Sequence, residues 1–140
     1  MNIVLFEDND FTGPERAQVS GRRLEHLKSV NRVTPGQVLV CGKLNGRMGQ
    51  GTIVKLSEDK CVFDLFLNTE PPPPLPLILV LALPRPKMFR RLVHTVTCLG
   101  IKQIHIVNSW RVEKSFWKSP AIESDTIRKQ MILGLEQCGD

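Results

Sequence analysis

Six consecutive residues near the middle of the chain, Pro71-Pro72-Pro73-Pro74-Leu75-Pro76, restrict the possible fold more than any other segment. Proline has no backbone N–H and fixes φ at about −65°, so this run cannot be helix or central strand. A stiff, extended connector is the expected conformation. The sequence therefore predicts two domains, residues 1–70 and residues 77–140, joined by a linker at residues 71–76.

Residues 1–70 have the pattern of short strands with tight turns. We expect strands at residues 2–6, 37–43, 51–56 and 61–67, and Asn45-Gly46 is suited to a hairpin turn between two of them. One short helix is expected at residues 20–30, with Ser20 as its N-cap and Leu24, Leu27 and Val30 facing inward. Several short strands in so few residues favour a small β-barrel.

Residues 77–140 alternate strand with helix. Residues 77–83 are continuously apolar, which is typical of a strand buried on both faces, and residues 101–107 form the next strand. Met88, Leu92, Val96 and Leu99 recur at helical spacing between them, and a second helix is expected at residues 124–138. This order predicts an α/β domain with a parallel sheet, so that the whole chain is α+β. Two strands are too few for a doubly wound sheet, and this half looks unfinished.

The charge of the chain is unevenly distributed. The net charge is +5, and residues 16–56 and residues 84–118 each carry eight Lys or Arg against a single acid, Glu25 and Glu113 respectively. Two basic stretches favour a phosphate backbone as the partner. The alternative is a set of charges scattered over solvated faces that serve only solubility.

The second basic stretch contains the strongest candidate site. Ligands of open α/β sheets gather beyond the carboxyl ends of the strands, and Arg85, Lys87 and Arg111 follow the two predicted strands, with Trp110 available for base stacking. Arg90, Arg91 and His94 continue one face of the next helix. The predicted RNA-binding residues are Arg22, Arg23, Arg32, Arg85, Lys87, Arg90, Arg91 and Arg111.

Other kinds of site have little support. The four cysteines form no CxxC pair, which argues against a metal site, and the sequence fits a cytoplasmic protein with reduced thiols and no membrane span. His105 lies in an apolar strand and is expected to be a core histidine. No Gly-rich phosphate loop occurs and no catalytic or cofactor-binding residue can be named.

Several motifs, in order, resemble those of the RsmE family of ribosomal RNA methyltransferases. They are His26-Leu27-Lys28-Ser29-Val30-Asn31-Arg32 with Pro35-Gly36, then Lys87-Met88, Cys98-Leu99-Gly100, Ser109-Trp110-Arg111 and Glu136-Gln137-Cys138-Gly139. The chain departs from the family pattern at Asn31, which replaces a leucine, at Cys98 and Trp110, which replace acids, and at Asp140, which replaces an arginine.

The resemblance implies a PUA-like barrel that helps to hold RNA, followed by the first half of a knotted SPOUT-type domain. It further implies S-adenosylmethionine as methyl donor, N3 of a uridine in small-subunit ribosomal RNA as the target, and a homodimer. The family's donor-binding loops lie beyond residue 140, so we expect a chain truncated before the donor site. Two alternatives stay open: a non-catalytic RNA-binding module, and a structural or assembly protein that uses the second half as an interface.

Overall fold

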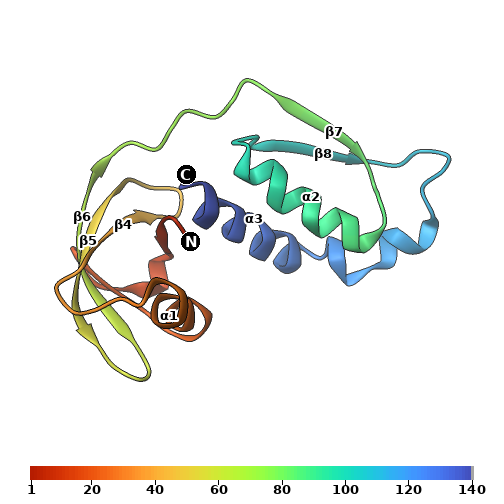
Figure 1. Cartoon of the computed structure of the whole chain (residues 1–140). Coiled ribbons are helices and arrows are strands. Elements are labelled where there is room, and N and C mark those ends of the chain that lie inside the picture. The colour runs from red at the N-terminus through yellow and green to blue at the C-terminus, as the bar shows by residue number, and fades with distance from the viewer. Residues whose placement is uncertain (140) are drawn as a thin grey trace. The chain divides into compact units, whose positions relative to one another are not determined.

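The computed structural model describes residues 1–139, so that Asp140 lies outside the described residues. The chain divides into two compact units, Met1–Pro71 and Pro72–Asp140 (Figure 1). Residues 71–76 are exposed and belong to no helix or strand, as expected for a proline-rich segment.

The N-terminal unit is a six-stranded, curled sheet. Its strands, in spatial order, are β1 (Val4–Phe6), β4 (Val38–Lys43), β5 (Met48–Leu56), β6 (Cys61–Thr69), β3 (Arg16–Val19) and β2 (Phe11–Gly13). β1 pairs with β4 in parallel and every other pair is antiparallel. The end strands β1 and β2 are not paired with each other in the described residues, so the small barrel that the sequence predicted is a curled half-barrel. The 3-10 turn η1 (Asp8–Asp10) diverts the chain between these two strands.

The concave side of this sheet holds the core of the unit. Phe6 and Phe63 are fully buried and meet edge to face, with ring centroids 5.4 Å apart. The turn between β4 and β5 confirms the predicted hairpin, because Asn45 has a φ of 59° and the Gly46 N–H donates to the Lys43 carbonyl at 2.9 Å.

A short helix crosses the N-terminal unit where the sequence predicted one. It begins as α1 (Gly21–His26) and widens into a π-helical turn, η2 (Leu27–Asn31), which Arg32 ends at a φ of 50°. Leu24 and Leu27 are buried as expected, but Val30 is 64% exposed. The wider turn changes the phase of the helix, so Val30 rotates outward and Val33 enters the core instead.

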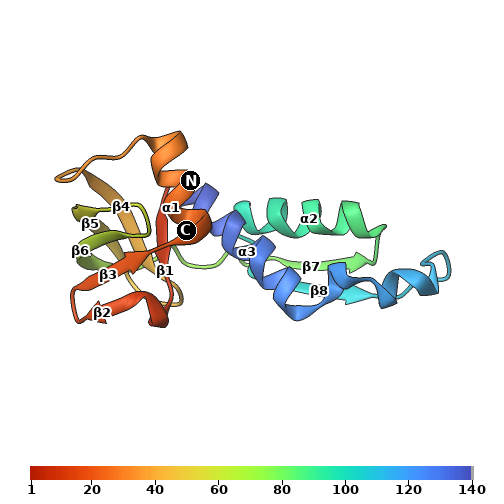
Figure 2. The same ribbon diagram turned by 90° about the horizontal axis from the view of Figure 1, so that it is seen from below.

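The C-terminal unit packs two helices on one face of a two-stranded parallel sheet (Figures 1 and 2). β7 (Ile78–Ala82) leads into α2 (Pro86–Cys98), and β8 (Gln103–Val107) is followed by two 3-10 turns, η3 (Lys114–Lys118) and η4 (Pro120–Ile122), and by α3 (Ser124–Cys138). Leu83, Phe89, Val93 and Ala121 form the buried core.

The sheet of the C-terminal unit shows that two predictions about burial are wrong. Residues 77–83 are not buried on both faces: Ile78 and Val80 are 60% and 63% exposed, because α2 and α3 cover only one side of β7 and β8. His105 is exposed on this open face and lies 3.1 Å from the Gln103 amide, so it is not a core histidine.

The inward face of α2 also differs from the prediction. Phe89, Val93, Val96 and Thr97 are buried, whereas Met88 and Leu99 are 47% and 61% exposed. The apolar residues of α2 are spaced so that either of two adjacent helix faces could be the buried one. The buried face is the one that contains Phe89, the largest apolar side chain of the helix.

Candidate nucleic-acid interface

Two loops leave the carboxyl edge of the parallel strands side by side. β7 and β8 pair in register from Ile78–Gln103 to Ala82–Val107, and the Leu83 N–H donates to the Val107 carbonyl at 3.1 Å just beyond the last pair. The first loop ends at Arg85, which is the N-cap of α2, and the second contains Arg111. This edge is where an open α/β sheet receives its ligand.

The first turns of α2 present a basic face. Lys87, Arg90 and Arg91 are exposed, and none of them has an ion-pair partner within residues 1–139. Pro86 occupies the start of the helix and no acidic residue lies in the first turn. The positive end of the helix dipole adds to these charges, so this face favours an anion. His94 is half-buried beside Cys98, with Nδ1 and Sγ 3.8 Å apart, and faces less of the solvent.

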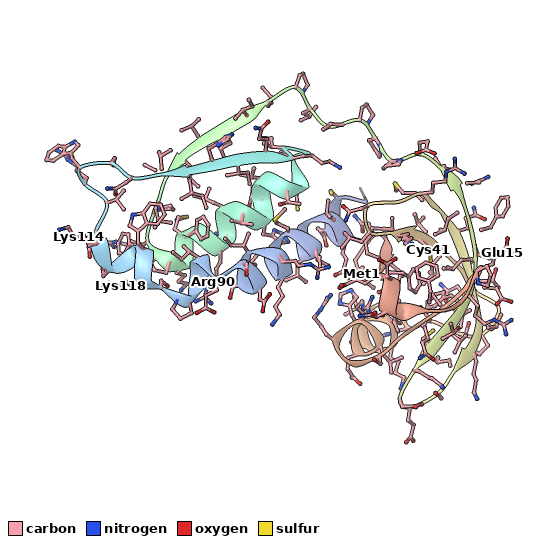
Figure 3. All side chains as sticks on the ribbon, turned by 180° about the vertical axis from the view of Figure 1, so that it is seen from behind. Met1, Glu15, Cys41, Arg90, Lys114 and Lys118 are labelled. Carbon is pink, nitrogen blue, oxygen red and sulfur yellow. The ribbon has the colours of Figure 1, made fainter. Side chains whose placement is uncertain are left out.

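The loop after β8 adds an aromatic platform. Trp110 is 87% exposed, and the Arg111 guanidinium lies 4.6 Å from the centroid of the indole ring. An exposed tryptophan stacked with an arginine offers a flat surface on which an unpaired base can stack. η3 follows this loop and carries Lys114 and Lys118 (Figure 3).

The three RNA-binding arginines predicted in the N-terminal unit lie in different surroundings. Arg22 and Arg32 are exposed, on α1 and at the end of η2. Arg23 instead makes two hydrogen bonds of 2.7 Å to the Asp10 carboxylate and a third, also 2.7 Å, to the Leu5 carbonyl. Both side chains of this pair are mostly buried, at 19% and 14% exposed. The geometry favours a structural role for Arg23 over the phosphate contact that the sequence predicted.

The basic edge of the C-terminal unit does not fit S-adenosylmethionine. That donor carries a sulfonium and an ammonium group against a single carboxylate, so the cluster of Arg and Lys side chains would repel more of its charge than it attracts. A close approach of backbone to ligand usually needs glycine, but Gly100 lies at the opposite end of β8 and Gly134 lies within α3, against α2. The arrangement can bind and orient phosphates.

Two further kinds of site are absent from residues 1–139. No three side chains of His, Cys, Asp or Glu lie close enough together there to hold a metal ion. None of the described helices is both long and apolar enough to cross a membrane.

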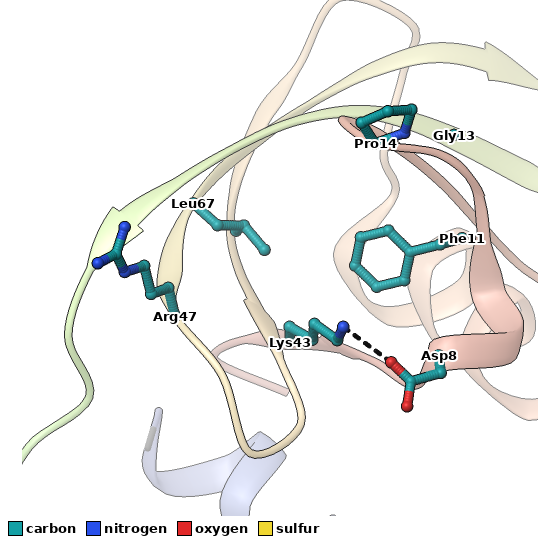
Figure 4. A pocket seen from close by; sticks show the side chains of 7 residues that line it. All are labelled: Asp8, Phe11, Gly13, Pro14, Lys43, Arg47 and Leu67. Atoms are coloured by element: carbon teal, nitrogen blue, oxygen red, sulfur yellow. Dashed lines mark ion pairs between the residues drawn. The ribbon is translucent and has the colours of Figure 1, made fainter.

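The sequence did not predict a hollow in the N-terminal unit that lies between β2, the β4–β5 hairpin and β6 (Figure 4). Lys43 and Arg47 were counted within the first basic stretch, but their position on either side of Asn45-Gly46 was the only signal that they belong together. Phe11 gave none, because β2 was not predicted.

Comparisons with known proteins agree with the motifs. A model of an RNA methyltransferase domain matches residues 71–140. The ribosomal RNA small subunit methyltransferase E of Treponema pallidum (strain Nichols) is 34% identical over 142 residues, which cover 99% of this chain and 53% of that protein. The chain thus spans about half the length of the curated relative that it matches.

Solved structures show the same fold at low sequence identity. The methyltransferase E of Neisseria gonorrhoeae, bound to S-adenosyl methionine, matches with a TM-score of 0.69 at 17% identity, over 99% of this chain and 57% of that one. A probable rRNA-methyltransferase from Porphyromonas gingivalis matches with a TM-score of 0.71 at 16% identity, over 98% of this chain and 56% of that one. These similarities show the fold and extend over both units.

Proposed function

This chain belongs to the RNA methyltransferase domain family of the RsmE type, and on that basis we propose that it serves S-adenosylmethionine-dependent methylation of N3 of a uridine in small-subunit ribosomal RNA. The observation that carries the proposal, beyond family membership, is the exposed basic face of α2 together with the stacked Trp110 and Arg111 in the loop after β8. The protein would work in the cytoplasm.

The residues of this chain would hold and orient the RNA. Arg85, Lys87, Arg90 and Arg91 neutralise phosphates at the carboxyl edge of β7 and β8, while Arg22 and Arg32 add contacts from the N-terminal unit. Trp110 receives an unpaired base, and Arg111 holds its phosphate close to the reacting uridine. We propose the two units as domains, the first PUA-like and the second of the knotted SPOUT type, in a homodimer.

The methyl donor is a separate part of the proposal. It supplies the methyl group, and no residue among 1–139 is assigned to it, because the basic edge does not fit it. We expect the 140-residue chain to bind S-adenosylmethionine weakly or not at all in calorimetry. Micromolar binding would show that these residues build a donor site after all.

The function is tested in a strain whose gene for this chain is deleted. Small-subunit ribosomal RNA from that strain, digested to nucleosides and measured by mass spectrometry, should lack 3-methyluridine, and the complete gene should restore it. A gene that carries Arg111→Ala should restore it only in part. Unchanged 3-methyluridine after deletion would contradict the proposal.

One observation favours a second candidate, an RNA-binding module without catalysis: the poor fit of the basic edge to the donor. This candidate predicts normal 3-methyluridine after deletion together with tight, salt-dependent binding of ribosomal RNA. The same deletion strain therefore separates the two functions.

A further inference from the structure

The hollow of the N-terminal unit has an apolar wall and a basic rim. Its volume is about 450 Å³, within the range of about 300–1,000 Å³ typical of small-molecule sites. Phe11, Pro14 and Leu67 form the apolar wall, and Lys43 points toward Asp8, which closes one side (Figure 4). Arg47 lies across the hollow, with its guanidinium turned outward toward Glu70. Every lining residue belongs to the N-terminal unit, so the hollow does not depend on the basic edge described above.

The aromatic ring is fixed in place by the fold. Phe11 packs edge to face on the fully buried Phe6, with ring centroids 6.1 Å apart. The Lys43 ammonium lies 5.3 Å from the centroid of Phe11. The Phe11 ring therefore packs against the core, while part of its face is turned to the hollow and to a cation.

The two cations are held by weak partners. Lys43 pairs with Asp8 at 2.8 Å and Arg47 with Glu70 at 2.7 Å, but the side chains of Asp8 and Glu70 are 85% and 72% exposed. Ion pairs this exposed stabilise a fold very little, so an incoming anion can replace the carboxylates at small cost. Lys43 can then leave the ring for that anion and uncover the face of Phe11.

We propose that this hollow receives one unpaired nucleotide of an RNA strand, with its base against Phe11 and Leu67 and its phosphate on Lys43 and Arg47. The inference rests on the proposed function and adds a second contact region to it. Once Arg47 has left Glu70 and turned inward, an aromatic face beside two cations matches the π-face and phosphate of a nucleotide, and stacking of this kind accepts any base. Asp8 is placed to accept a hydrogen bond from the ribose 2′-hydroxyl or from an amino group of the base. A bare phosphate would leave the apolar wall without a role.

The first test is an NMR titration of the isotope-labelled chain with uridine 5′-monophosphate, with inorganic phosphate at equal concentration in a parallel sample. We expect the amide signals of Gly13, Lys43 and Leu67 to shift with the nucleotide and to shift much less with phosphate. Absence of shifts at millimolar nucleotide overturns the proposal. Equal shifts with both compounds also overturn it, because they reveal an anion site only.

The second test uses matched variants and a fluorescent single-stranded RNA. Phe11→Leu, which keeps apolar volume in the core, should weaken binding about fivefold or more. Phe66→Leu is the matched control, since Phe66 is 66% exposed on β6 but does not line the hollow. This variant should leave the RNA affinity unchanged. Arg47→Gln should weaken binding, whereas Arg16→Gln, which breaks an equally short exposed pair with Asp64, should not.

The outcomes separate this inference from the proposed function. If Arg90→Ala/Arg91→Ala weakens RNA binding while Phe11→Leu and Arg47→Gln do not, the nucleotide site is overturned and the RNA-binding edge stands. If the nucleotide shifts the amide signals of Gly13, Lys43 and Leu67 but deletion of the gene leaves the amount of 3-methyluridine unchanged, the nucleotide site stands and the proposed methylation is contradicted. If Phe11→Leu does not fold, the comparison of Arg47→Gln with its control Arg16→Gln still decides the test.

Discussion

At the scale of single residues, the partner of each arginine indicates what the arginine does. Arg23 is mostly buried and donates to Asp10 and to the Leu5 carbonyl, so it fixes the start of α1 to the sheet. Arg90 and Arg91 are exposed and without a carboxylate partner within residues 1–139. The sequence showed eight cations in each basic stretch but could not distinguish these two kinds, because Asp10 lies outside the basic stretch that contains Arg23.

Replacement of Arg23 tests this distinction. Arg23→Ala should lower the free energy of unfolding by about 2–3 kcal/mol, because it removes both guanidinium donors from the mostly buried Asp10 carboxylate, which keeps the Glu7 N–H, and one donor from the Leu5 carbonyl. Arg16→Ala breaks a pair whose side chains are 57% and 47% exposed and should cost less than about 1 kcal/mol. Urea denaturation of both variants gives the comparison, and an equal decrease in both would contradict it.

The two buried thiols predict a loss of stability in alkali. Burial, with Cys61 as a second and smaller cause, raises the pKa of Cys41 from 9.0 to about 12, and burial raises the pKa of Cys61 to about 11. The folded state keeps both protons after the unfolded state has lost them. The stabilisation is therefore complete below about pH 9 and is lost as the pH rises from there toward 11–12.

Urea denaturation at pH 8 and pH 10 measures this effect. The stability should fall by about 1.4 kcal/mol for each thiol at pH 10, and Cys41→Ala should show a smaller fall than the unmodified chain. The chain has no tyrosine, so no phenol titrates in this range. An identical fall in the variant would show that another group is responsible.

At the scale of elements, the contact between α2 and α3 depends on one glycine. A Cβ at Gly134 would lie 2.8 Å from the His94 carbonyl oxygen and 2.8 Å from the Thr97 Cβ. Neither is the end of a flexible side chain, so the helices must separate to admit a methyl group. The sequence predicted both helices but gave no sign of this contact, since a glycine within a helix more often signals a weak point than a packing site.

Gly134→Ala tests the contact. Alanine favours helix over glycine by about 1 kcal/mol, yet overpacking of about 1–3 kcal/mol should exceed that gain, so we expect a net loss of stability. Lys129→Ala, an exposed position on the same helix, should change the stability by less than about 0.5 kcal/mol. Thermal unfolding followed by the helical circular dichroism signal measures both, and a more stable Gly134→Ala variant would contradict the close approach.

At the scale of the whole molecule, local sequence patterns predicted most helices and strands, but they seldom predicted which face of each element is buried. The proline run, the Asn45-Gly46 hairpin and the order strand, helix, strand, helix were readable because each depends on residues close in sequence. β2 and β3 were missed because each mixes apolar with polar residues or glycine over only three or four positions, whereas the equally short β1 lies in an apolar run. The faces of β7 and α2 depend on what packs against them, and the hollow at Phe11 depends on three separate segments, none of which is visible from one stretch of chain.

The central claim, that the exposed basic face of α2 binds ribosomal RNA through phosphates, is tested most directly by a salt titration of RNA affinity. Fluorescence anisotropy with a fragment of small-subunit ribosomal RNA should give a steep decrease in affinity as salt rises. Arg90→Ala/Arg91→Ala should weaken binding and reduce the log–log slope by about 1.4, because each phosphate of a single strand that a cation neutralises contributes about 0.7 to that slope. Arg32→Ala should act in the same direction, while Lys60→Ala, in an acidic turn, should not. Affinities and slopes that match the unmodified chain across the titration would contradict the claim and leave these side chains as a solvated face.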